Sequence, residues 1–185
     1  RIVRSAQRAF DVERWKALAR PDSPVKDGDL ITLGFDGAMF HDATGLVATH
    51  VETGYQWVVG VWEAPLNAHD WQVPADEVDD AVSAMFERYD VWRMYADPPY
   101  WQSWLAQWAG RYGSDRVMEW WTNRRRPMTY ALRAFEEAIA EGTISHDGNE
   151  ALTRHIGNAC RHELQQRDEE GRPLWLIRKE RPDSP

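Results

Sequence analysis

The chain has 185 residues, of which 43% are hydrophobic and 28% are charged, and this composition is ordinary for one globular domain. No apolar run approaches the roughly 20 residues of a membrane-spanning helix, and no signal-peptide pattern is present. The single cysteine, Cys160, excludes an internal disulfide and a metal site built from several cysteines, and the net charge of −8 argues against non-specific nucleic-acid binding by the whole surface.

The first 27 residues are interpreted as a lead-in to the main domain. Residues 6–20 have helical spacing, with Phe10, Trp15 and Leu18 on one side. Two prolines and a glycine within residues 21–29 then interrupt this pattern and predict a loop. The domain itself is expected to occupy residues 28–185.

From residue 31 onward, the pattern predicts alternating strands and helices. Short apolar runs indicate strands, and apolar residues repeated every three or four positions indicate helices. The expected strands are 31–38, 45–51, 55–63, 91–96, 117–122 and 174–178, and the expected helices are 75–88, 101–112, 127–141 and 149–164. Three meandering strands followed by alternating helices and strands predict an α/β fold, with a mixed sheet and helices on both of its faces.

Two of the expected strands end in a carboxylate. Asp36 closes the apolar run that begins at Ile31, and Asp97 follows the run at 91–96. Ligands of such sheets bind beyond the carboxyl ends of the parallel strands. If these two strands are parallel neighbours, the two carboxylates converge at that edge.

Two neighbouring carboxylates repel each other, and a divalent cation removes the repulsion. Mg²⁺ and Mn²⁺ prefer oxygen ligands, and one or two carboxylates with water and substrate phosphate suffice to hold them. The alternative is local: Asp36 begins a turn, and Asp97 caps the helix that follows Pro98 and Pro99. Their shared position at strand ends favours the metal site.

Acidic and basic residues are segregated along the chain. Residues 63–97 contain nine acidic residues, whereas residues 111–133 contain six arginines. The run Arg124, Arg125 and Arg126 precedes a helix and is a candidate phosphate contact, and Lys179 after the last strand is another. Solvated surface is the alternative for both. His146 and Asp147 are expected to shape a turn.

The eleven tryptophans raise a further alternative, which is a stacking surface for sugars or bases. However, Trp101, Trp104 and Trp108 recur at one helix face. Core packing therefore explains these three residues better.

Four segments of the chain resemble the carboxy-terminal nuclease domain of the large terminase subunit of tailed bacteriophages, in the form found in phages of actinobacteria. They occur in the family's order over about residues 28–185, and they read "ITLGFDGAMFHDATGLVATHV", "MYADPPYWQSWLAQWAGRYG", "WWTNRRRPMTYALRAFEEAIAEGTISHDGNEALTRHIGNACRHEL" and "LWLIRKERPDSP". The resemblance implies a ribonuclease H-like fold and metal-dependent endonuclease cleavage of concatemeric viral DNA.

The resemblance also implies roles for individual residues. Asp36 and Asp97 correspond to catalytic metal ligands at the ends of the first and fourth strands, and Asp42 to a nearby acid in the outer shell or on a second metal. The complete site is expected to hold two Mg²⁺ or Mn²⁺ ions. The family's third acid follows the last strand, so here it is expected beyond Pro185, and Asp183 is a poor substitute because it lies among prolines.

The partners implied by this family are double-stranded viral DNA, an ATPase domain of the same chain, the portal protein and the small terminase subunit. Residues 1–27 resemble the link from that ATPase domain, and the expected location is the cytoplasm of the bacterial host, on the procapsid portal. The chain has no GxxxxGK[ST] loop, so ATP hydrolysis is not expected of these residues. Two alternatives remain: another ribonuclease H-like nuclease of the resolvase type, and a non-catalytic docking module of the packaging motor.

Overall fold

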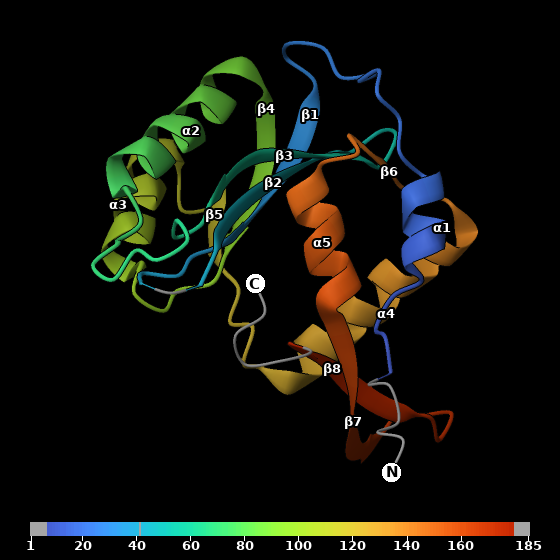
Figure 1. Cartoon of the computed structure of the whole chain (residues 1–185). Coiled ribbons are helices and arrows are strands. Elements are labelled where there is room, and N and C mark those ends of the chain that lie inside the picture. Colours follow the sequence, from blue (N-terminus) through green and yellow to red (C-terminus); the bar gives the residue numbers. More distant parts are fainter. Residues whose placement is uncertain (1–6, 41, 180–185) are drawn as a thin grey trace. The chain divides into compact units, whose positions relative to one another are not determined.

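The computed structural model describes residues 7–40 and 42–179, which divide into two compact units (Figure 1). The sheet unit comprises residues 20–121 and 145–147. The helix–hairpin unit comprises residues 7–19, 122–144 and 148–179 of the described chain. In the described residues, no helix is long and apolar enough to cross a membrane.

The sheet unit contains one six-stranded mixed sheet with the order β5-β4-β1-β2-β3-β6. β2 is antiparallel to both β1 and β3, whereas β4 is parallel to β1 and to β5, and β6 is parallel to β3. The strands are β1 (Leu30–Asp36), β2 (Thr44–His50), β3 (Tyr55–Trp62), β4 (Asp90–Ala96), β5 (Val117–Glu119) and β6 (Ser145–His146). The predicted mixed sheet is therefore confirmed.

Two helices, α2 (Ala75–Arg88) and α3 (Gln102–Tyr112), lie along one face of this sheet (Figure 1). The face is apolar because alternate residues of each strand point toward the helices, as Ile31, Leu33 and Phe35 do in β1. The bounds of α2 agree with the predicted helix. Trp101 and Trp108 are fully buried in this core and Trp104 packs against it, which confirms the expectation that these tryptophans are packing residues.

The helix–hairpin unit combines three helices with a two-stranded hairpin. Its elements are α1 (Val12–Ala17), α4 (Arg125–Glu141), α5 (Glu150–Asn158), β7 (Ala159–Arg167) and β8 (Pro173–Lys179). Trp15 and Leu18 of the lead-in, together with Phe10, are buried against Leu132 and Ile139 of α4. The lead-in therefore packs within this unit, and the side that the sequence predicted to be apolar is the buried one.

Residues 7–9 pair with the beginning of β7. The N–H of Ala9 donates to the carbonyl of Ala159, and the N–H of Arg161 donates to the carbonyl of Gln7. A bridge between Arg8 and Cys160 lies between these two bonds. The segment thus adds an extended edge to the hairpin.

Two element predictions were wrong, and one short strand was missed. The helix expected over 149–164 ends at Asn158, and the residues after it form β7. Leu152, Ile156 and Cys160 have helical spacing, but pairing with β8 overrides this local preference. The strand expected over 117–122 stops at Glu119, and the two-residue strand β6 was missed because so short an element carries no periodicity.

Candidate metal centre and nucleic-acid interface

Asp36 and Asp97 lie side by side at the carboxyl edge of the sheet. β1 and β4 are parallel neighbours, Phe35 is paired with Ala96, and the N–H of Asp97 donates to the carbonyl of Phe35 at 3.0 Å. Neighbouring strands are about 4.8 Å apart. The condition under which the two carboxylates converge is therefore met.

Both carboxylates are on the face of the sheet opposite to α3. Phe35 and Ala96 are buried in the core beneath α3, and side chains alternate along a strand, so the next residue of each strand points to the other face. Tyr95 shares that face, and its ring packs edge-on against Trp120 at a centroid distance of 5.9 Å. The carboxylate pair thus has an aromatic neighbour on the β4–β5 side.

Glycines keep the other side of Asp36 open. Gly34 precedes it by two residues on the same face, and Gly45 is its partner across β2. A Cβ built on either glycine would meet no heavy atom within 4 Å. Among the described residues, therefore, no side chain fills the positions that a Cβ would take on these two glycines. The apolar pattern of the sequence did not reveal this arrangement, although glycines at these two positions were its signal.

The loop after β1 is fixed in place by Trp101. The indole N–H of Trp101 donates to the carbonyl of Ala38 at 3.2 Å, and its ring packs edge-on against Phe35 at 5.0 Å. A Cβ on Gly37 would lie 2.3 Å from the Trp101 nitrogen, so only glycine permits this approach. The hydroxyl of Thr44 donates to the carbonyl of Ala38 and accepts from its N–H. The backbone beyond Asp36 is thus tied to the segment beyond Asp97.

These two carboxylates fit a hard divalent cation. They supply oxygen donors from the ends of two paired parallel strands, and Mg²⁺ is commonly held by one or two carboxylates with water. Asp42 lies in the loop at the same edge and is exposed. Within residues 7–40 and 42–179, no group of three or more His, Cys, Asp or Glu side chains is arranged to hold a metal ion.

The remaining acids of interest lie elsewhere. Asp147 follows β6, where its N–H donates to the carbonyl of Gln56 and its carboxylate accepts from the N–H of Val58 at 3.0 Å. Asp147 therefore continues the pairing of β6 with β3, and His146 before it is a buried residue of β6, so the expectation that these two residues shape a turn was wrong. Asp183 lies outside the described residues.

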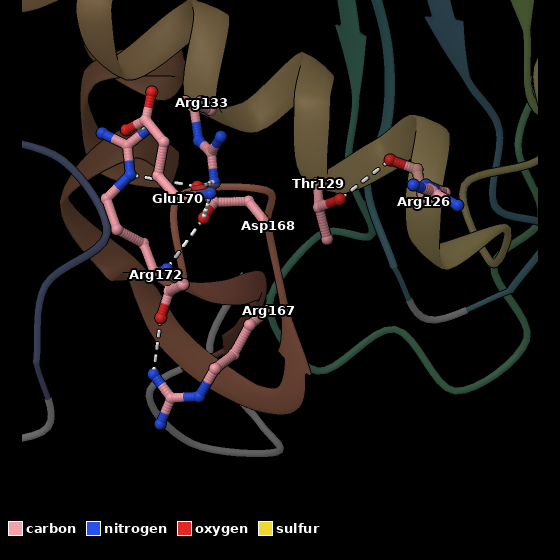
Figure 2. Close-up of polar contacts among 8 residues, drawn as sticks. Arg126, Thr129, Arg133, Arg167, Asp168, Glu170 and Arg172 are labelled. Atoms are coloured by element: carbon pink, nitrogen blue, oxygen red, sulfur yellow. Dashed lines mark hydrogen bonds and ion pairs between the residues drawn. The ribbon is translucent and has the colours of Figure 1, made fainter.

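The arginine run begins helix α4 of the helix–hairpin unit. Arg124 is the N-cap, Arg125 and Arg126 open the first turn, and all three are exposed, with no acidic residue in that turn. The hydroxyl of Thr129 donates to the carbonyl of Arg126 at 2.8 Å and steadies this end (Figure 2). Helix N-termini attract anions, so three cations and the helix dipole act in the same direction here.

A buried carboxylate ties the β7–β8 hairpin to the same helix (Figure 2). The side chain of Asp168 is 5% exposed, and one of its oxygens lies 3.0 Å from the Arg133 guanidinium of α4. The other oxygen accepts from the N–H groups of Glu170 and Arg172, and the Arg172 guanidinium also donates to the carboxylate. Lys179 is the last residue of β8 and is exposed.

We expect Asp168→Asn to loosen the hairpin at neutral pH. Burial raises the pKa of the Asp168 carboxyl. Hydrogen bonds from the Arg172 N–H, the Arg172 guanidinium and the Glu170 N–H lower this pKa by more than burial raises it, so the net shift is downward. The pKa of Asp168 is lower in the folded chain than in the unfolded chain, where it is about 4. The stabilisation by the ionised carboxylate is therefore complete above the unfolded pKa, and it is lost as the pH falls through the folded pKa.

Amide exchange at the hairpin, measured from pH 7 down to pH 3, checks this expectation. Protection in the parent chain should fall with acid, whereas Asp168→Asn should begin low and change little. Glu169→Gln, an exposed neighbour in the same turn, is the matched control and should behave like the parent chain. Equal protection of the parent and Asp168→Asn at pH 7 would show that the carboxylate does not hold the hairpin.

No protein-family model matches the chain. The Gene 13 protein of Mycobacterium phage L5 is 32% identical to it over 154 residues, which are 77% of this chain and 25% of the relative. The chain thus spans about a quarter of the length of the curated relatives that it matches.

Solved structures of terminases share the fold. The large terminase nuclease of thermophilic phage G20c with bound magnesium matches with a TM-score of 0.62 and 13% identity, over 96% of this chain and 92% of that one. The HK97 bacteriophage large terminase matches with a TM-score of 0.66 and 16% identity, over 97% of this chain and 42% of that one. The predicted ribonuclease H-like fold, and the resemblance to large terminase nucleases at the level of the fold, are therefore confirmed.

Proposed function

We propose that this chain is the nuclease domain of a phage large terminase subunit and that it cleaves concatemeric double-stranded DNA in a metal-dependent reaction. The observation that carries the proposal is the side-by-side position of Asp36 and Asp97 at the ends of two parallel strands. The fold shared with terminase nucleases supports it. Nicking of supercoiled plasmid in Mg²⁺ or Mn²⁺, abolished by a chelator, is the direct test.

Asp36 and Asp97 would hold the metal. Divalent ions bound there, two in the complete site, would activate the attacking water and stabilise the leaving oxygen of the phosphodiester. The two strands fix both carboxylates before substrate arrives, so little order has to be gained on binding. Asp42, in the adjoining loop, would orient water bound at the same edge.

The distribution of charged side chains favours the helix–hairpin unit as the part of the chain that contacts DNA. The sheet unit contains 18 acidic and 6 basic side chains, whereas the described part of the helix–hairpin unit contains 10 acidic and 13 basic ones. Phosphates are therefore repelled by most of the sheet unit, except where a bound cation reverses the local charge. Arg124, Arg125, Arg126 and Lys179 are the proposed phosphate contacts.

Replacing all three of these arginines by alanine should weaken duplex binding and flatten its salt dependence. Each neutralised phosphate contributes about 0.9 to the slope of log affinity against log salt, so the slope should fall by up to about 2.7. Fluorescence anisotropy with a labelled duplex at several salt concentrations measures this change.

The control variant replaces Lys16, Lys26 and Arg116, which are exposed and scattered, and also removes three positive charges. Its slope should stay close to that of the parent chain, because no shared contact is lost. If the two triple variants have the same slope, the arginine run contributes only net charge and its role as a phosphate contact fails.

The partners proposed for the whole protein follow from the same assignment. They are double-stranded viral DNA, an ATPase domain of the same chain, the portal protein and the small terminase subunit, in the cytoplasm of the bacterial host. This chain covers 42% of the HK97 large terminase. A protein of that length would therefore have room for an ATPase domain as well. The absence of both metal binding and cleavage would instead favour a docking module that keeps the fold but has lost its metals.

A further inference from the structure

Tyr100 adopts a backbone conformation that is unfavourable for tyrosine. The N–H of Trp101 donates to the carbonyl of Pro98 at 2.9 Å, and this bond closes a turn with Pro99 second and Tyr100 third. The φ angle of Tyr100 is +65°. A proline at the second position and a positive φ at the third position are typical of a type II β-turn. The third residue of such a turn is usually glycine or asparagine. A tyrosine there is strained.

Packing of the Tyr100 side chain does not account for the strain. The residue is 67% exposed, whereas Pro98 and Trp101 on either side of it are buried. The turn is held at both ends: Asp97 donates its N–H to Phe35, and Trp101 donates its indole N–H to Ala38. The fold therefore presents an exposed phenol ring from a fixed frame, three residues after Asp97.

The edge that carries the carboxylates also carries other exposed apolar side chains. Phe40 is 46% exposed in the loop after β1, and Leu66 is 96% exposed in the loop after β3. β1, β3 and β4 all run in the same direction, so these loops and the Tyr100 turn lie at one edge of the sheet. Tyr100 differs from the other two in its fixed frame and in following Asp97 by only three residues in the chain.

From this geometry we propose that Tyr100 stacks on a nucleobase beside the phosphate that the carboxylate site engages. The inference rests on the proposed function. An aromatic ring accepts any base because every base has a π face, and such stacking is sequence-tolerant. The base has to leave its own stack first, so the contact favours DNA in which a pair next to the cut is mismatched or frayed.

Three variants separate stacking from structural support. Tyr100→Ala and Tyr100→Gly remove the ring, and Tyr100→Phe keeps it. Glycine relieves the strain at φ +65°, so Tyr100→Gly should melt at a temperature at least as high as Tyr100→Ala. If Tyr100 acts only in folding, the activities of the variants should follow their melting temperatures. If Tyr100 stacks on a base, Tyr100→Ala and Tyr100→Gly should both lose activity, whatever their melting temperatures.

The experiment measures kcat/KM in Mn²⁺ on two labelled duplexes, one fully paired and one with a central mismatched pair. The parent chain and Tyr100→Phe should prefer the mismatched duplex, and Tyr100→Ala and Tyr100→Gly should lose about tenfold on it while binding Mn²⁺ like the parent. If the parent cleaves but Tyr100→Ala keeps the parent's activity on the mismatched duplex, the stacking inference alone is overturned. If the parent neither binds Mn²⁺ nor cleaves, the proposed function falls, and the inference with it.

Discussion

Asp36→Asn is expected to abolish detectable Mn²⁺ binding and to lower plasmid nicking by about a thousandfold or more. In the proposed site this carboxylate would supply one of the two charged ligands at the sheet edge. The stabilisation that a catalytic metal gives is several kcal/mol, with each 1.36 kcal/mol equal to a factor of ten in rate. Calorimetric titration with Mn²⁺ and a nicking assay measure the two losses.

The folded chain should survive this substitution and should gain stability in the absence of metal. Asp36 and Asp97 are neighbours, so a neutral amide removes a like-charge repulsion. Glu52→Gln, in the turn at the opposite edge of the sheet, changes the charge equally and should leave binding and nicking unaltered. Mn²⁺ binding to Asp36→Asn with the affinity of the parent chain would refute the metal assignment.

Trp101→Ala is expected to lower the free energy of unfolding by about 3–5 kcal/mol and to weaken Mn²⁺ binding by about tenfold or more. Trp101 is fully buried, and it is the residue that ties the loop after Asp36 to the turn after Asp97. Its loss leaves a cavity beside Phe35 and removes the hydrogen bond to Ala38. Denaturant unfolding and metal titration report the two effects separately.

Trp108→Ala is the matched variant for this prediction. Trp108 is equally buried and also packs on Phe35, but its indole N–H donates to Asp79 of α2 and not to the loop after Asp36. It should lose a similar free energy of unfolding and keep its metal affinity. Equal metal affinities in the two tryptophan variants would show that the tie through Trp101 does not position Asp36.

The sequence pattern alone predicted those elements whose residues have one clear local preference. Helix α2 was predicted with its observed bounds because Val78, Val82 and Met85 form one apolar stripe and nothing competes with it. The convergence of Asp36 and Asp97 was expected on the condition that their two strands are parallel neighbours, and the pairing of β1 with β4 meets that condition.

What the sequence did not give depends on contacts between distant residues. The segment after Asn158 has helical spacing, but it becomes a strand because β8 lies against it. The turn at Tyr100 is local, but the bond from the Asp97 N–H to Phe35 that anchors it joins two different strands, and the glycine opposite Asp36 lies in the next strand. No local window of the sequence contains these distant partners.

The pairing of residues 7–9 with the start of β7 has a consequence for the order of folding. Some 150 residues separate these partners, and at about 5–20 residues per second a ribosome needs roughly 10–30 seconds to make that stretch. The sheet unit lacks only its short edge strand once residue 121 is synthesised. We therefore expect the side chains of Phe10 and Trp15 to stay exposed to solvent until the last third of the chain, which contains α4 and β7, has been synthesised.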